Sequence, residues 1–449
     1  MGNGVEEIES DDHEEHLERV AAIDVAKASG KVCVRLPHPS VPDRRVTKVW
    51  DVAATTNAIA DLADELAELS IERVVLESTS DYWRGFFYVL EARGLCVWLV
   101  NARDVRNVPG RPKTDKLDSI WLAKLNERGM LRPSFVPPRE IRELRDYTRL
   151  RTDLVRERSR HKQRVEKVLE DALVKVSAVA SDIFGVSGRA MLAALIAGER
   201  DPETLAELAK RKLRRKIPAL REALTGRFDE HHGELLQLLL RQVDQLSADI
   251  DALTSRIEEL IGQIPAAQAP EVDGGSGDEM DSAAGGPLGV VERLDEVTGI
   301  GHVAAQAVIA EIGLDMGQFP TPGHLVSWAK VTPRTVQSGS RTRGAKTGKG
   351  NPYLKGALGE AAAAVIGTDT FLGARHRRLV KRIGKLKALV AIERSILVIV
   401  WHLLSDPTAR FHDLGSDFYE RRIDKDRRTH DLVRQLIALG HEVTLRPAA

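Results

Sequence analysis

The spacing of apolar residues predicts that the chain begins with three β-strands. Residues 20–25 form a short apolar run, and residues 31–36 form a second one after a glycine turn. Residues 45–50 alternate between apolar and polar side chains, as a half-exposed strand does. Because the turns between these runs are short, we expect an antiparallel sheet.

After residue 54 the apolar residues recur with a helical period and then alternate between helix and strand. Residues 55–69 predict a helix, residues 73–78 a buried strand, 81–93 a helix, 96–100 a buried strand, and a further helix begins after Thr114. Near-continuous apolar strands between helices are typical of parallel pairing. The sequence therefore predicts an α/β domain in which three strands are followed by helix, strand, helix, strand and helix.

Four acidic residues fall at the ends of these elements. Asp24 lies inside an apolar strand and Glu77 near the end of another. Asp115 and Asp118 are three residues apart in the first turn of a helix that Thr114 caps, so their carboxylates share one face. An acid in an apolar strand is costly unless it is paired or binds a metal. Four carboxylates at one sheet edge suit two Mg²⁺ ions, and local pairing with Arg or Lys is the alternative.

The middle of the chain predicts long helices. Residues 137–262 are highly charged, and an apolar stripe runs through them at Leu144, Leu150, Leu154, Val165, Val168 and Leu169. A second, heptad-like series follows at steps of three and four: Leu236, Leu239, Val243, Leu246, Ile250, Leu253, Ile257 and Leu260. We interpret these stripes as an antiparallel coiled-coil arm that can mediate self-association.

Shifts in composition divide the chain further. A Gly-, Ala- and Pro-rich stretch with acidic residues is typical of a linker. The expected parts are an acidic disordered tail (1–18), an α/β domain (19–136), a helical coiled-coil arm (137–263), a linker (264–290), a mainly helical domain (291–410) and a C-terminal tail (411–449).

The last folded domain is predicted to begin with a glycine turn between helices. Gly299 and Gly301 precede an Ala-, Val- and Ile-rich helix, which is the pattern of a helix-hairpin-helix. Such a hairpin can offer backbone N–H groups and a helix N-terminus to a phosphate. A plain tight turn is the alternative interpretation.

Charge is strongly segregated although the net charge is zero. Residues 330–387 carry fourteen Lys and Arg against two acidic residues, which indicates a polyanionic partner, most simply nucleic acid. The candidate nucleic-acid contacts in the first part of this segment are Arg334, Arg341, Arg343, Lys346 and Lys349. Further basic stretches at 139–167 and 208–227 are either nucleic-acid contacts or solvated helical faces.

The stretch from 331 to 351 is a Ser-, Thr- and Gly-rich loop with many cations, followed by a predicted helix over 353–366. It is suited to phosphate binding. It also holds serines in a cationic setting, where a hydroxyl can attack phosphorus and the developing charge is stabilised.

The chain's cysteines and apolar segments limit its compartment. Only two cysteines occur, without a Cys-x-x-Cys pair, which fits a reducing compartment and excludes a zinc or disulfide framework. The acidic start excludes a secretory signal or a mitochondrial presequence. The apolar stretch 388–404 contains Glu393 and Arg394, so we expect a buried helix and no membrane partner.

The order of elements resembles the ribonuclease H-like layout. Together with the second domain, the chain resembles bacterial insertion-sequence transposases that join an N-terminal RuvC-like DEDD domain to a C-terminal helix-hairpin-helix domain with a catalytic serine, the bridge-RNA-guided recombinases. The matching motifs are Ala22-Ile23-Asp24, Leu76-Glu77-Ser78-Thr79, Lys113 to Asp118, Thr298 to Gly301 and Pro333 to Gly339. They lie within about residues 19–175 and 291–375.

This resemblance implies site residues and partners. It implies that Asp24, Glu77, Asp115 and Asp118 bind Mg²⁺ and that Ser338 is the nucleophile, with Ser340 as a neighbouring candidate. It implies donor and target DNA, a structured guide RNA that pairs with both, and a dimer or tetramer with composite sites in the bacterial cytoplasm, associated with the nucleoid when active.

The expected function is therefore Mg²⁺-dependent DNA strand exchange through a covalent phosphoserine. Two alternatives use the same residues differently. In the first, the protein is a junction-resolving nuclease in which water is the nucleophile and Ser338 only binds phosphate. In the second, it is a nucleic-acid-binding protein without catalytic activity.

Overall fold

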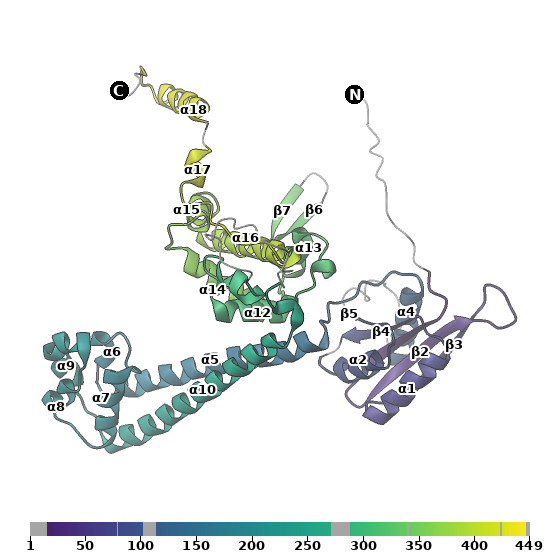
Figure 1. Ribbon diagram of the computed structural model, residues 1–449, viewed down its shortest axis with the longest axis horizontal. Helices are drawn as coiled ribbons and strands as arrows, with labels where there is room; N and C mark the ends of the chain where they lie inside the picture. Colours follow the sequence, from purple (N-terminus) through teal and green to yellow (C-terminus); the bar gives the residue numbers. More distant parts are fainter. Residues whose placement is uncertain are drawn as a thin grey trace, which may run out of the picture. The chain divides into compact units, whose positions relative to one another are not determined.

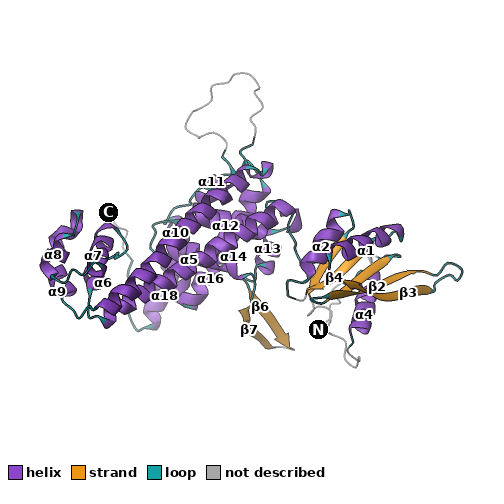
Figure 2. Cartoon of the chain, turned by 90° about the horizontal axis from the view of Figure 1, so that it is seen from below, coloured by secondary structure: helices purple, strands orange, loops and turns teal. Residues whose placement is uncertain are grey.

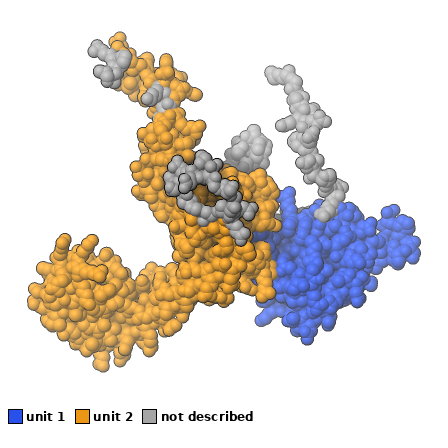
Figure 3. Space-filling model, viewed as in Figure 1, with its two compact units in different colours: residues 1–136 blue, residues 137–449 orange. Residues whose placement is uncertain are grey.

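The computed structural model describes residues 16–78, 80–101, 114–270, 288–338, 341–422 and 424–445. The chain forms two compact units, residues 1–136 and residues 137–449, which are coloured separately in Figure 3. Each unit has its own buried apolar core.

The first unit is built on a five-stranded sheet with the strand order β3-β2-β1-β4-β5. β1, β2 and β3 are antiparallel, and β4 and β5 run parallel to β1. The elements of this unit are β1 (Val20–Val25), β2 (Ser29–Pro37), β3 (Arg45–Ala53), α1 (Thr56–Glu68), β4 (Arg73–Ser78), α2 (Trp83–Ala92), β5 (Val97–Asn101) and α4 (Asp115–Glu127). The predicted order of strands and helices is confirmed.

Helices cover both faces of this sheet. α1 and α2 lie on one face and α4 on the other, as Figure 2 shows. Because successive side chains of a strand point to opposite faces, Ala21 and Ile23 of β1 join the core beneath α1 and α2. Ala22, between them, packs with Leu122 and Ala123 of α4.

Buried polar contacts fix the direction of α4 against the sheet. Asn126, near the end of α4, donates from Nδ2 to the carbonyls of Ala21 (3.2 Å) and Arg73 (3.1 Å), at the starts of β1 and β4. The neighbouring Glu127 is buried and pairs with Arg35 and Arg45 of β2 and β3. The C-terminus of α4 therefore lies at the start of β1 and β4, and its N-terminus points toward their ends.

The second unit contains an arm of two helices of 33 residues each, α5 (Arg139–Asp171) and α10 (Glu230–Gly262), which run side by side in Figure 1. They are antiparallel, since Asp171 at the end of α5 contacts His232 at the start of α10, whereas Arg158 donates to Ser247 further along α10. The tip of the arm consists of α6 (Val176–Val179), α7 (Val186–Ile196), α8 (Pro202–Glu207), the 3₁₀ helix η1 (Arg211–Lys216) and α9 (Ile217–Leu224).

The apolar stripe predicted for the first helix of the arm is wrong at one position. Leu150 is 49% exposed, and its neighbour Arg151 is only 3% exposed. This half of α5 packs against α12 (His302–Ile312), where Gln306 accepts a hydrogen bond from Arg151 at 2.7 Å. A polar partner on the facing helix compensates the burial of the guanidinium, so the buried face is not wholly apolar.

The remainder of the second unit is mainly helical. It contains η2 (Pro265–Ala267), α11 (Val290–Asp295), α12, η3 (Met316–Gln318), α13 (Pro322–Trp328), β6 (Pro333–Ser338), β7 (Arg341–Thr347), α14 (Pro352–Val365), α15 (Phe371–Ile383), α16 (Lys385–Ser405), α17 (Phe418–Arg421) and α18 (Lys425–Ala438). α16 is long and apolar enough to cross a membrane by length and composition, but it packs against α13, α14 and α15 and buries Ile392, Ile396 and Val400. These contacts are those of a core helix.

Candidate active site

Two of the predicted acidic residues lie on neighbouring parallel strands of the first unit. Ile23 of β1 is paired with Leu76 of β4, so Asp24 and Glu77 are the next residues along the two strands. By the alternation of the strands, both side chains project to the face that Ala22 and Val75 share with α4. Asp24 and Glu77 are half-buried.

The other two acidic residues lie in the first turn of α4. Thr114 caps this helix, and its hydroxyl accepts the N–H of Leu117 at 3.3 Å. Asp118 is half-buried and lies one turn before the fully buried Leu122, on the side that faces the sheet, while Asp115 is exposed.

The direction of α4 places Asp118 at the level of Asp24 and Glu77. Eight residues separate Asp118 from Asn126, which is about 12 Å along a helix. Asn126 bonds to Ala21, and from there to Asp24 is about 10 Å along a strand. Asp24, Glu77 and Asp118 thus lie at the same end of the sheet, where β1 and β4 end and α4 begins.

The donor set at this place fits a magnesium ion in type, because carboxylate oxygens are its preferred protein ligands. The side chains of these acids do not surround a common point. Among the described residues, no three of these four acids have oxygens within 4.8 Å of one another. To coordinate one ion together, these carboxylates would have to move closer to one another.

Another group of potential ligands lies in the arm, where single atoms of Asp171, His231 and His232 come within 4.8 Å of one another. The hydrogen bonds of His232 argue against a metal here. Its Nδ1 accepts the N–H of Asp229 at 3.1 Å, so the proton is on Nε2, which faces Asp171. Metal binding at Nε2 would place a proton on Nδ1 and break this helix cap. These residues are better explained as a polar contact that holds the end of α5 against the start of α10.

The predicted nucleophile lies in a β-hairpin of the second unit. The sequence predicted a loop over 331–351, whereas the structure has the antiparallel strands β6 and β7. The run Thr335-Val336-Gln337 favours a strand. The hairpin stands out from the surrounding helices in Figures 1 and 2.

Ser338 is the last residue of β6, and its backbone is paired with Arg341. The side chains of Ser338, Arg334, Arg341 and Arg343 lie outside the described part of the chain, and so does all of Ser340. Lys346 at the end of β7 and Lys349 beyond it are exposed.

The two predicted glycines lie between α11 and α12. Gly299 has φ +94°, and a Cβ there would lie 2.3 Å from the carbonyl oxygen of Ala361 in α14. This position needs glycine both for its left-handed backbone and for close packing. Gly301 is the N-cap of α12, has room around it, and precedes a first turn in which His302 and Val303 are exposed. Packing alone therefore explains Gly299, and Gly301 remains the better candidate for phosphate contact.

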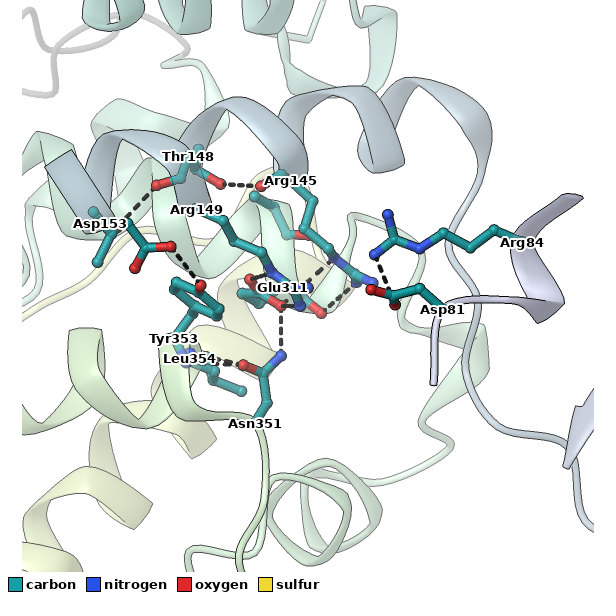
Figure 4. A network of polar contacts seen from close by, with 12 residues as sticks. Asp81, Arg84, Arg145, Thr148, Arg149, Asp153, Glu311, Asn351, Tyr353 and Leu354 are labelled. Atoms are coloured by element: carbon teal, nitrogen blue, oxygen red, sulfur yellow. Dashed lines mark hydrogen bonds and ion pairs between the residues drawn. The ribbon is translucent and has the colours of Figure 1, made fainter. Parts of the chain in front are cut away.

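A network that the sequence did not predict joins α5, α12 and the start of α14 (Figure 4). The carboxylate of Glu311 is 1% exposed and accepts hydrogen bonds from Arg149 at 2.7 and 2.8 Å. Arg145 donates to the carbonyls of Ala310 and Glu311, both at 2.9 Å. Asn351 donates to the same carboxylate and caps α14 through its Oδ1. In the sequence, the single acid in the apolar run 308–312 was the feature that could have indicated this network.

Electrostatics favour the charged form of Arg149 in this network. Burial alone would lower the pKa of Arg149, but its hydrogen bond and ion pair with Glu311 outweigh that effect and raise it. Tyr353, two residues after Asn351, donates its hydroxyl to Asp153 of α5 at 2.8 Å. The helix that follows the β-hairpin is therefore fixed to the arm by charged and polar contacts at its first turn.

Comparisons with known proteins agree on a family. Residues 21–173 match a model of DEDD transposases of the IS110 type, and residues 291–376 match the model described as "Transposase IS116/IS110/IS902 family". Together the two matches span just over half of the chain, and they contain all four acidic residues, both glycines and Ser338. The RuvC structure from Thermus thermophilus is similar over 26% of this chain and 99% of that one, with 12% identity and a TM-score of 0.21. No curated protein matches the sequence.

Proposed function

Because the chain belongs to the IS116/IS110/IS902 family of transposases, we propose that it exchanges DNA strands through a covalent phosphoserine at Ser338. The observation that carries the proposal is the placement of Asp24, Glu77 and Asp118 at one end of the sheet, at two strand ends and one helix start. Asp115 completes the set from the exposed side of the same helical turn. The N-terminal domain, residues 19–136, is proposed to have the ribonuclease H-like fold.

The four carboxylates would hold two Mg²⁺ ions, and these would stabilise the negative charge that develops on a phosphodiester in displacement chemistry. The hydroxyl oxygen of Ser338 attacks the phosphorus and loses its proton. The bond from phosphorus to the 3′-oxygen breaks, and that oxygen takes up a proton. A 3′-hydroxyl of the partner strand then attacks the phosphoserine and releases Ser338. Each step exchanges one phosphoester bond for another, so no external energy source is needed.

The two parts of the proposed site belong to different units, the acids to residues 1–136 and Ser338 to residues 137–449. The proposal requires them to meet, either within one chain or between chains of a dimer or tetramer. The arm of α5 and α10, interpreted as a coiled coil, supports self-association, because antiparallel helix pairs of this length can extend their apolar seam to another copy.

Nucleic acids are the proposed partners. Donor and target DNA follow from the activity, and a structured guide RNA that pairs with both is proposed from the resemblance. In that case base pairing would read the sequence. The cations of the hairpin and of the segment after it, Lys346 and Lys349 among them, would bind the nucleic-acid backbone. Gly299 and Gly301 would form a helix-hairpin-helix on the same DNA. The proposed compartment is the bacterial cytoplasm.

The test is a search for a protein–DNA adduct. The full chain, its RNA, cognate DNA and Mg²⁺ are incubated and separated on a denaturing gel. An adduct that is lost in Ser338→Ala and kept in Ser340→Ala supports the proposal. The reverse pattern would assign the nucleophile to Ser340.

The rival candidate is a hydrolytic nuclease, which the acidic group supports because all its members come from one unit. Cleavage without an adduct that persists in Ser338→Ala would establish it. Binding without cleavage in any condition would leave a non-catalytic nucleic-acid-binding protein.

A further inference from the structure

The tip of the arm carries a basic pocket that the proposed strand exchange does not use. The pocket has a volume of about 650 Å³ and lies between η1 and the start of α7. It is lined by Lys210, Arg211, Lys212 and Lys216, and Asp182 is the one acidic residue among the described residues of its lining. The surrounding helices bury a shared apolar core, so the pocket belongs to a folded structure.

Several cations of this segment have no acidic partner. Among the described residues, Lys210, Lys212 and Arg215 are exposed and make no side-chain hydrogen bond or ion pair. Arg214 differs, because it pairs with Glu207 at 3.0 Å. Three unneutralised charges so close together repel one another, and a solvated surface ordinarily mixes signs.

The backbone of this segment is nevertheless held in place. The N–H of Lys210 donates to the hydroxyl of Ser187 at 2.9 Å. Lys216 donates to the carbonyl of Val179 at 2.7 Å, and Leu213 packs against the core of the tip. The charges are therefore presented from a fixed framework.

A helix start adds to the positive potential. α7 begins after Gly185 without a side-chain cap, and Val186 and Ser187 of its first turn line the pocket. Uncapped amides and the helix dipole favour an anion there. The carboxylate of Asp182 is engaged with its own backbone segment, since it accepts the N–H of Phe184 at 2.8 Å.

We propose that this surface binds the phosphodiester backbone of a nucleic acid, and this inference rests on the proposed function. A small anion would need only one phosphate site, whereas the six residues of η1 extend about 12 Å. That length covers more than one phosphate of a strand. None of the described residues that line the pocket is aromatic, so the contact is with the backbone and is independent of sequence.

The experiment measures binding by fluorescence anisotropy over a series of salt concentrations, in EDTA. The probes are an RNA hairpin and a DNA duplex of unrelated sequence. The test variant is Lys210→Ala/Lys212→Ala in the full chain, and Arg427→Ala/Arg428→Ala on the exposed α18 removes the same charge elsewhere. All four side chains are exposed, so neither variant disturbs a core, and a thermal melt of each confirms this.

We expect the test variant to bind at least one probe about tenfold more weakly at low salt, with a salt slope reduced by about two. Weaker binding of the RNA alone, of the DNA alone or of both supports the inference and shows which nucleic acid the surface binds. Unchanged binding of both probes, or an equal loss in the control variant, overturns it. Because EDTA prevents the chemistry, this result is independent of the adduct at Ser338.

Discussion

Arg149 of α5 and Glu311 of α12, 162 residues apart in the chain, form a bidentate ion pair at 2.7 and 2.8 Å with the carboxylate almost fully buried. Asn351 donates to that carboxylate and caps α14, the first helix after the β6–β7 hairpin. The pair therefore joins the arm to the segment that follows Ser338.

Replacing Glu311 by Gln should destabilise the second unit. The change keeps the shape but leaves Arg145 and Arg149 next to a neutral group, and breaking a buried pair from one side costs about 3–5 kcal/mol. Because Arg149 is 29% exposed, we expect a lower value of about 2–3 kcal/mol. Chemical denaturation of the full chain measures it. The matched control, Glu259→Gln in an exposed pair on α10, should change stability far less. Equal effects of the two substitutions would contradict the importance of burial.

Gly299 and Gly301 should respond differently to substitution. Gly299→Ala introduces a Cβ at a left-handed position, 2.3 Å from the carbonyl of Ala361, so we expect a loss of about 1–3 kcal/mol from backbone strain alone. Gly301→Ser keeps a favourable N-cap and the new side chain has free space, so the melting temperature should change little. If the start of α12 contacts phosphate, Gly301→Ser weakens DNA binding at unchanged stability. A stable Gly299→Ala variant would show that the turn can relax.

Magnesium should stabilise the first unit through its acidic group. A ligand that binds only the folded state raises the melting temperature with concentration. We expect this rise in the wild type and its loss in Asp24→Asn and Asp118→Asn, together with a roughly hundredfold slower adduct formation, equivalent to about 2.7 kcal/mol of transition-state stabilisation. The control is Asp61→Asn, an exposed carboxylate on α1 at the other face of the sheet. If the melting temperature responds to Mg²⁺ equally in all four proteins, Mg²⁺ does not bind at this acidic group.

Glu393 should make the second unit less stable as the pH rises. It is 7% exposed in α16, and burial raises its pKa above the usual 4.5, partly offset by the charge of Lys355. A raised carboxyl pKa means that the folded state holds the proton more tightly than the unfolded one. Stability is therefore highest below pH 4.5 as far as this group is concerned, and falls as the pH rises through the folded-state pKa.

The substitution Glu393→Gln should flatten that part of the pH profile and leave the protein at least as stable as the wild type at pH 7. Denaturation at pH 5 and at pH 7.5 makes the comparison. The exposed Glu360→Gln on α14 should leave the difference between the two pH values unchanged. A steeper profile in Glu393→Gln would mean that the pairing with Lys355 outweighs desolvation.

The sequence by itself determined the elements of the first unit and the strand ends at which acids lie. Its period changes from two to 3.6 at residue 54. The bounds predicted for β1 and β4 and the predicted start of α4 agree with the structure to within one residue. These features are local, because alternation and helical spacing depend on neighbours a few positions away.

Only the tertiary structure decided which residues meet across long distances in the chain. The parallel pairing of β1 with β4 sets Asp24 beside Glu77, and the bonds of Asn126 turn the start of α4 toward them. In the second unit, Arg151 is buried and Leu150 exposed because α12 offers Gln306 to that face of α5. Such polar burial depends on a partner that folds back from far along the chain, and no periodicity within one helix encodes it.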